Sequence, residues 1–287
     1  SSKVDHQKVT FKNRYGITLA ADLYLPKNRG NQRLAALVVG GPFGAVKEQS
    51  SGLYAQTMAE RGYVTLAFDP SYTGESGGEP RHVASPDINS EDFSAAVDFI
   101  GLHASVDRNR IGVIGVCGWG GIALNAVAVD KRVKAVVAST MYDMSRVMSK
   151  GYNDSVTPEQ RAQRLEQMGQ QRWKDAENGS PAMLPMFNVL KGGEPQFVVD
   201  YADYYKSKQR GFHPRAIDIR HTRQPRLDMF EAGCRVGQLY IVTARRRFRF
   251  TALPGIFATF DGPQPGRRYV ESASAVTVDL VRHQPCS

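Results

Sequence analysis

Apolar and polar residues alternate in two short stretches near the start of the chain, residues 8–13 and residues 18–26. The stretches flank the polar turn at residues 14–16, and a period of two is typical of strands that bury one face. We therefore expect an antiparallel β-hairpin here. Further along, continuous apolar runs replace the alternation, as is typical of parallel strands buried on both faces. These runs are residues 34–40, 63–68, 111–116 and 133–139.

Helical patterns separate these runs. The sequence predicts helices at residues 48–61, closed by Gly62, at residues 90–103, capped by Asn89, and at residues 122–129. Alternation of strand and helix predicts an α/β fold, with a mostly parallel sheet and helices on both of its faces. A length of 287 residues is enough for one large domain of this kind with an insertion.

The chain is organised around residues 111–121, which read Ile-Gly-Val-Ile-Gly-Val-Cys-Gly-Trp-Gly-Gly. This pattern predicts a strand, a sharp turn at Cys117 and a helix. A helix N-terminus lowers the pKa of a thiol from about 8.5, so the position suits a nucleophile. The alternative is a small buried cysteine, since free cysteine is often buried. Gly115, Gly118 and Gly120 favour the nucleophile, because a strand-to-helix elbow needs small residues.

The elbow resembles that of the α/β-hydrolase superfamily, Gly-x-nucleophile-x-Gly. It is most similar to the branch of dienelactone hydrolases and prolyl-oligopeptidase-like enzymes, and residues 106–113 resemble the same region of those proteins. The resemblance extends over roughly residues 8–215 and implies an α/β-hydrolase fold and a hydrolytic activity. One departure is Trp119, which stands where the family has a small residue.

A glycine-rich turn, Gly-Gly-Pro-Phe-Gly at residues 40–44, follows the first buried run. It resembles the oxyanion loop of the family, and the resemblance places one backbone N–H donor at Phe43 and the second at Gly118. Asp69 ends the next buried run. We interpret it as a structural carboxylate, because acidic residues in loops commonly accept local N–H bonds.

The regular alternation of strand and helix stops after residue 140. Thr157 and Pro158 start one predicted helix, which reaches about residue 177, and a second is expected at residues 196–208. A helical insertion at this place resembles the cap of such hydrolases. We therefore expect three parts: a first part of the core at residues 1–140, a cap at 141–212, and the rest of the core at 213–287.

Residues 217–287 do not resemble the family. The family pattern requires a strand ending in a carboxylate and a later loop with a histidine base. By chain order His283 is the candidate base and Asp261 its orienting acid. Residues 217–287 contain eleven arginines and no lysine, and carry +5 of the formal net charge of +9.

Two explanations of this composition are open. One is a genuine divergent tail. The other is a change of reading frame near Ile217, since a GC-rich gene read out of frame yields Arg, Pro, Ala and Gly at the expense of Lys. Translation of the other two frames after codon 216 would decide, because the authentic frame should contain the missing strand-acid and loop-histidine pattern.

These patterns together predict a hydrolase of ester, thioester or lactone bonds, with Cys117 as nucleophile, Phe43 and Gly118 as oxyanion donors, and a small-molecule substrate. No cofactor is expected, and the three cysteines include no CxxC pair, which argues against a structural zinc site. The lack of a long apolar stretch predicts a soluble chain with no membrane partner. The cysteines form no disulfide framework, which favours a reducing, cytoplasmic compartment, and a homo-oligomer stays open. The alternative is a non-catalytic hydrolase-fold protein that binds nucleic acid or a partner through residues 245–250. We favour a simpler interpretation of these residues, which is a strand with a solvated basic face or out-of-frame sequence.

Overall fold

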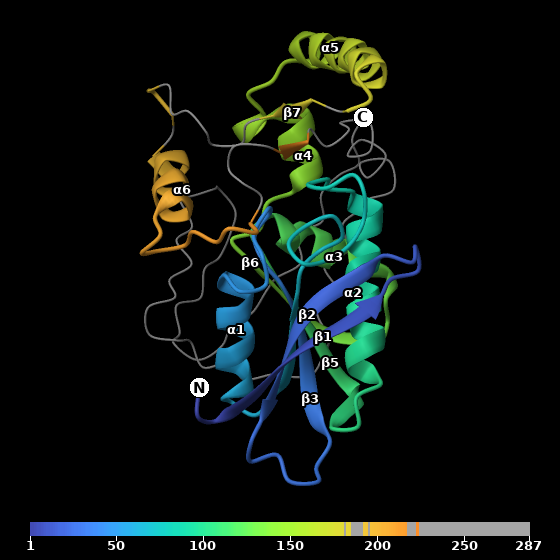
Figure 1. Ribbon diagram of the computed structural model, residues 1–287, viewed down its shortest axis with the longest axis vertical. Coiled ribbons are helices and arrows are strands. Elements are labelled where there is room, and N and C mark those ends of the chain that lie inside the picture. The colour runs from blue at the N-terminus through green and yellow to red at the C-terminus, as the bar shows by residue number, and fades with distance from the viewer. Residues whose placement is uncertain (181, 185–191, 195, 217–221, 224–287) are drawn as a thin grey trace, which may run out of the picture.

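The computed structural model describes residues 1–180, 182–184, 192–194, 196–216 and 222–223 (Figure 1). A six-stranded sheet lies at its centre, with strands in the order β1-β2-β4-β3-β5-β6. Its strands are β1 (Val4–Lys12), β2 (Thr18–Pro26), β3 (Leu34–Gly40), β4 (Val64–Phe68), β5 (Val106–Val116) and β6 (Val133–Ser139).

The strands β1 and β2 form the predicted antiparallel hairpin, and β2 pairs antiparallel with β4. The strands β4, β3, β5 and β6 are mutually parallel, so their carboxyl ends meet at one edge of the sheet. The loops that follow β3, β4 and β5 contain Phe43, Asp69 and Cys117 respectively. The parallel pairing therefore gathers these three predicted residues at the same edge.

Helix α1 (Ser50–Ala59) covers one face of the sheet, and α2 (Pro86–Gly101) and α3 (Gly118–Val129) cover the other (Figure 1). Successive residues of β3 face opposite sides, because side chains alternate along a strand. Ala36 and Val38 belong to the core under α2 and α3, whereas Leu37 and Val39 belong to the core under α1. The α/β fold with helices on both faces is thus confirmed.

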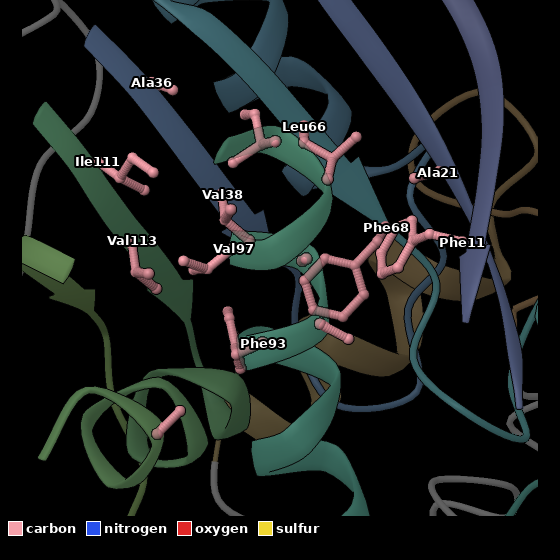
Figure 2. Packing of buried hydrophobic residues seen from close by; sticks show 14 of the residues in the cluster. Phe11, Ala21, Ala36, Val38, Leu66, Phe68, Phe93, Val97, Ile111 and Val113 are labelled. Atoms are coloured by element: carbon pink, nitrogen blue, oxygen red, sulfur yellow. The ribbon is translucent and has the colours of Figure 1, made fainter. Parts of the chain in front are cut away.

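The larger core lies between the sheet and the helices α2 and α3 (Figure 2). The Phe93 ring on α2 contacts the Phe68 ring edge-on, with 5.2 Å between the centroids, and lies 5.9 Å from the Trp119 ring. Trp119 is 4% exposed. The tryptophan that departs from the family pattern thus serves as a core residue, which explains why a large side chain is accommodated there.

One predicted helix boundary is wrong. Helix α2 begins at Pro86, with Ser85 at the N-cap position, rather than after Asn89. The Asn89 side chain lies inside the helix instead, where it accepts a hydrogen bond from the Ser85 N–H (2.9 Å) and donates one to Asp92 (3.0 Å). Pro at the first helical position lets the helix start one turn earlier than the cap pattern indicates.

Residues 141–212 contain the helices α4 (Met144–Lys150), α5 (Pro158–Glu177) and α6 (Gln196–Lys206), and a short 3-10 helix at Tyr152–Asp154. Two short strands, β7 (Met183–Leu184) and β8 (Thr222–Arg223), pair with each other. The helices predicted after Thr157 and at residue 196 are confirmed, while the division into core and cap remains a prediction. Within the described part of the chain, no helix combines the length and apolar character needed to cross a membrane.

Candidate active site

The elbow at Cys117 joins β5 directly to α3. Cys117 has φ 58° and ψ −129°, a backbone conformation that residues other than glycine rarely adopt. Backbone hydrogen bonds hold it there: its N–H donates to the Ser139 carbonyl (2.9 Å), and its own carbonyl accepts from Gly120 (2.9 Å) and Tyr142 (3.2 Å). The neighbouring strand and the start of α3 thus fix a cysteine in a strained turn at the edge of the sheet.

The elbow is tight because glycines let the strand and the helix approach each other. A Cβ atom at Gly115 would lie 2.6 Å from the Trp119 carbonyl oxygen and 2.7 Å from the Ala123 Cβ. A Cβ atom at Gly118 would lie 3.1 Å from the Phe43 Cβ. The predicted need for small residues around Cys117 is therefore confirmed, and Gly118 in particular brings the two predicted donor residues into contact.

The backbone N–H groups of Phe43 and Gly118 both hydrogen-bond to the Cys117 sulfur. The Phe43 N–H comes from the loop after β3, which turns through a hydrogen bond from the Ala45 N–H to the Pro42 carbonyl (3.0 Å). The Gly118 N–H is the first of α3. Two donors from separate segments thus act on the same thiol, and their role as an oxyanion hole stays a prediction.

Burial raises the pKa of the Cys117 thiol, and the hydrogen bonds from Gly118 and Phe43 lower it without offsetting the burial. We predicted a lowered pKa for Cys117, and that prediction is wrong when only the described residues surround the thiol. The helix end does supply one donor, the Gly118 N–H. However, removing a thiolate from water destabilises it more than hydrogen bonds from two N–H groups stabilise it. At neutral pH the thiol is protonated unless a base accepts its proton.

Three tyrosines gather near the thiol. The Tyr142 and Tyr201 hydroxyls are hydrogen-bonded to each other, and Tyr201 and Tyr205 lie within electrostatic range of Cys117. Burial raises the pKa of both Tyr201 and Tyr205, and the hydrogen bond with Tyr142 raises that of Tyr201 further, so both hydroxyls are neutral at neutral pH. The sequence did not indicate the two tyrosines of α6 as residues of the site.

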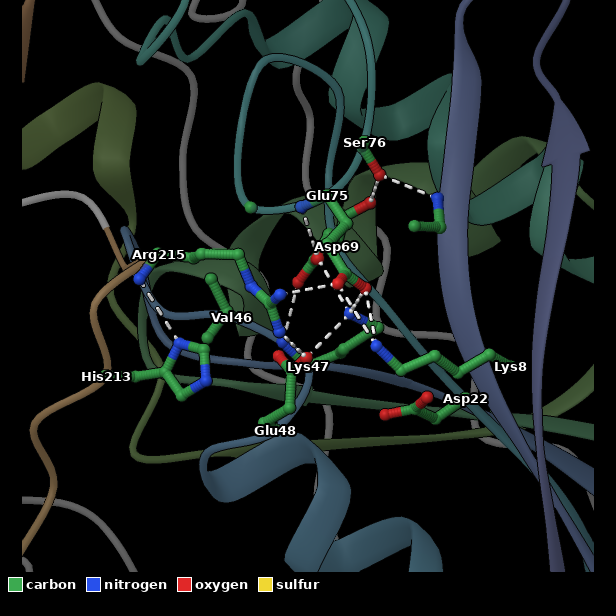
Figure 3. A network of polar contacts seen from close by, with 12 residues as sticks. Lys8, Asp22, Val46, Lys47, Glu48, Asp69, Glu75, Ser76, His213 and Arg215 are labelled. Carbon is green, nitrogen blue, oxygen red and sulfur yellow. Dashed lines mark hydrogen bonds and ion pairs between the residues drawn. The ribbon is translucent and has the colours of Figure 1, made fainter.

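A buried charge cluster supports the loop after β3 (Figure 3). The Lys47 side chain is 1% exposed, and its Nζ lies 2.6 Å from Glu75 and 3.2 Å from Asp69. Asp69 also accepts the backbone N–H groups of Lys47 (2.7 Å) and Glu75 (2.8 Å). Asp69 is thus a structural carboxylate, as predicted, and it joins the loops after β3 and β4.

The predicted base His283 and its predicted partner Asp261 lie outside the described residues, as do residues 245–250. Among the residues that the structure does describe, no cluster of three or more His, Cys, Asp or Glu side chains could hold a metal ion. The site that can be built from the described residues therefore consists of one thiol, two backbone donors and the surrounding tyrosines.

The sequence matches the family described as X-Pro dipeptidyl-peptidase (S15 family) over residues 15–185, which is more than half of the chain. The chain belongs to this family. The match includes the loop with Phe43, the elbow with Cys117 and the start of the predicted cap. It confirms the resemblance to α/β hydrolases and makes the chain a member of a hydrolase family.

Several curated proteins are similar to this chain in sequence. The protein PA2218 of Pseudomonas aeruginosa is 79% identical over 218 residues, which are 76% of this chain and 58% of the relative. YcjY of Escherichia coli is 34% identical over 214 residues, covering 74% of this chain and 70% of the relative. The thiohydrolase aneE of Aspergillus aculeatus is 30% identical over 188 residues, covering 64% and 56%. The chain thus spans less than three fifths of the length of PA2218.

Solved structures agree with the fold. The crystal structure of PA2218 superposes with a TM-score of 0.78 at 75% identity, covering 80% of this chain and 72% of that one. The α/β hydrolase GrgF from Penicillium sp. sh18 shares the fold, with a TM-score of 0.55 at 24% identity over 83% of this chain and 69% of that one. The α/β-hydrolase fold is therefore confirmed.

Proposed function

We propose that this member of the S15 family hydrolyses ester, thioester or lactone bonds of a small substrate, with Cys117 as the nucleophile. One observation carries the proposal. Two backbone N–H groups, from Phe43 and Gly118, meet at the sulfur of a cysteine held at positive φ after a parallel strand. A nucleophile and an oxyanion hole are two of the three elements that acyl transfer needs, the third being a base.

In the proposed reaction the Cys117 thiol gives its proton to a base, and the sulfur attacks the carbonyl carbon of the substrate. The carbonyl π electrons move to the oxygen, which accepts hydrogen bonds from the Phe43 and Gly118 N–H groups. When the carbonyl re-forms, the bond to the leaving alcohol or thiol breaks and the leaving group takes up a proton. Water then attacks the resulting thioester in the same way, which releases the acid and restores the thiol.

The proposal requires a base, because burial keeps the Cys117 pKa above its ordinary value. His283, oriented by Asp261, is proposed for this role on chain order, since the family order is nucleophile, acid, histidine. A histidine beside the thiol would lower its pKa by forming an ion pair. Without such a base, acylation would be slow and the acyl-enzyme would persist.

Thioesters are the preferred test substrates for a specific reason. The relative aneE carries the name thiohydrolase. A cysteine nucleophile also exchanges one thioester for another at little cost in free energy, so the first step needs less help from the protein than with an oxygen ester. Met144 lies against Gly118, and Tyr142, Tyr201 and Tyr205 surround the thiol, which favours a small apolar or aromatic acyl group.

Pre-steady-state kinetics test the proposal. A Cys234→Ser, Cys286→Ser background leaves Cys117 as the only thiol, and is mixed with p-nitrophenyl acetate and separately with an N-acetylcysteamine thioester. We expect one equivalent of leaving group per chain in a fast phase, followed by slower turnover. Cys117→Ala in the same background should show neither phase. An unchanged fast phase in that variant would overturn the proposal.

The family name suggests a second substrate class, an X-Pro peptide. Expulsion of an amine requires an acid that protonates it, whereas a thiolate leaves unaided. We therefore expect no fast phase with an X-Pro anilide under conditions in which the thioester reacts. Binding of nucleic acid through residues 245–250 also remains a prediction, and a steep loss of binding with salt would support it.

A further inference from the structure

The segment after α6 returns to the loop that carries Phe43 (Figure 3). Arg215 contacts Glu48 through Nη2 and Glu75 through Nη1, both at 2.6 Å. The Gln49 side-chain amide donates a hydrogen bond to the Gly211 carbonyl. Residues 211–215 are therefore joined to residues 48–49, which lie between the oxyanion loop and α1, and to Glu75 in the loop after β4.

Arg215 completes a cluster in which the charges balance. Lys8, Lys47 and Arg215 are positive, whereas Glu48, Asp69 and Glu75 are negative. Burial alone would raise the Glu48 pKa, but Lys47 and Arg215 hold it below its usual range. The hydrogen bond from Lys47, with further help from Lys8 and Arg215, lowers the pKa of Glu75 to about 2. Both carboxylates are therefore charged at neutral pH and available to the guanidinium.

The helix that precedes this contact, α6, lies near Cys117. Helix α6 carries Tyr201 and Tyr205, whose hydroxyls are in electrostatic range of Cys117. Tyr201 is hydrogen-bonded to Tyr142, and the Phe197 ring, at the first turn of α6, lies 4.9 Å from the Tyr152 ring of the 3-10 helix. The other end of α6 is followed by the segment that Arg215 fixes. The helix is thus attached at both ends, through an aromatic contact and through an ionic one.

We propose that Arg215 is a positioning residue, an ionic anchor that ties the end of α6 to Glu48 and Glu75 and so keeps Tyr201 and Tyr205 near Cys117. The proposal rests on the proposed function only in taking Cys117 as the reacting group. A guanidinium suits this task because its planar fork can bind two carboxylates at once. Lys47 is buried against Asp69 and paired with Glu75, and it holds the loop after β3 without Arg215. Loss of Arg215 should therefore release α6 and leave the two backbone donors in place.

Because Lys47 holds the loop after β3 and Arg215 holds α6, loss of Arg215 should change KM much more than kcat. In Arg215→Met the oxyanion hole keeps its geometry, so kcat should stay within about threefold of the parent protein. The tyrosines of α6 are no longer held near the thiol, so KM for the thioester should rise by about tenfold, the effect of losing one charge-assisted contact. Arg215→Lys keeps the charge but not the fork, and should recover part of the change.

Alkylation of Cys117 tests the anchor independently of catalysis. Iodoacetamide is added to the full chain, and modification of the Cys117 peptide is followed by mass spectrometry, which separates it from Cys234 and Cys286. We expect Arg215→Met to react about tenfold faster at Cys117. The control is Arg210→Met, which removes an exposed pair with Asp203 on the same segment and should react at the parent rate.

Glu48→Gln provides a second route to the same result, because it weakens the contact from the opposite side. Circular dichroism before alkylation confirms that each variant is folded, which is expected since the Arg215 side chain is 41% exposed. Equal alkylation rates in Arg215→Met, Glu48→Gln and the parent would overturn the anchor. Faster alkylation in a protein that shows no acyl transfer would uphold the anchor and refute the proposed function.

Discussion

Gly115→Ala perturbs the elbow at its tightest point. The new methyl carbon would lie 2.6 Å from the Trp119 carbonyl oxygen, 2.7 Å from the Ala123 Cβ and 2.8 Å from the Gly120 Cα. Non-bonded carbon atoms prefer separations of about 3.5–4.0 Å. All three contacts belong to α3 or its backbone, so the strain cannot be relieved by rotation of a flexible side chain. The start of α3 must move away from β5 by about 1 Å.

Two effects should follow from this displacement. Overpacking a well-packed core costs about 1–3 kcal/mol, which lowers Tm by roughly 2–10 °C in a protein of this size. Movement of the Gly118 N–H away from the sulfur weakens the oxyanion hole, and a displacement of about 1 Å can cost about 100-fold in rate. Thermal unfolding followed by circular dichroism measures the first effect, and the fast phase with the thioester measures the second.

Gly169→Ala is the matched control. Gly169 lies within α5, a helix with no buried residue, and a Cβ atom there would meet no atom within 4 Å. This variant should keep both Tm and the rate of the fast phase, because it only adds a better helix former on an exposed surface. A Gly115→Ala variant with the Tm of the parent protein and a fast phase within twofold of the parent would refute the steric reasoning about the elbow.

Other predictions concern stability. Phe93→Ala removes a buried ring from the larger core and should cost about 3–5 kcal/mol in urea unfolding, and a cost below about 1 kcal/mol would contradict the packing. Glu75 has a folded-state pKa of about 2, below the ordinary value, so it stabilises the protein above about pH 4.5 and loses this effect as the pH falls through 2. The difference in unfolding free energy between parent and Glu75→Gln should therefore shrink on acidification, and a difference that grows would oppose the role of Lys47. Thr157→Ala deletes the capping box of α5 and should speed amide exchange in that helix with no change in Tm, whereas a fall in Tm would mean that α5 supports the core.

Much of the fold could be predicted because buried parallel strands have a local signature. The runs at β3, β4, β5 and β6 are continuous and apolar, and they end at turn residues, so their positions were correct to within a residue or so at the end where each loop begins. The elbow at Cys117 was predictable because glycines follow an apolar run directly, and Gly115 is required by contacts with Trp119 and Ala123, within a few residues of it. The start of helix α2 was predicted too late in the chain because Asn89 forms its hydrogen bonds inside the helix. The sequence pattern does not distinguish an asparagine at the cap from one in the first turns.

The rest of the site depends on contacts between distant segments. Tyr201 and Tyr205 lie more than eighty residues after Cys117, and no local pattern indicates that α6 stands near the end of β5. The ion pairs of Arg215 with Glu48 and Glu75 are equally non-local. The Cys117 pKa was predicted to fall, whereas it rises. The sequence indicates the helix N-terminus, but it does not indicate that the thiol is buried.

A covalent acyl adduct on Cys117 tests the central claim most directly. The protein is mixed with the thioester, quenched in acid within the fast phase, digested and analysed by mass spectrometry. The account predicts one acyl group per chain, attached to the peptide that contains Cys117, and no adduct at that peptide in Cys117→Ala. An acyl group on any other residue, or turnover of the thioester in Cys117→Ala at the parent rate, would contradict it.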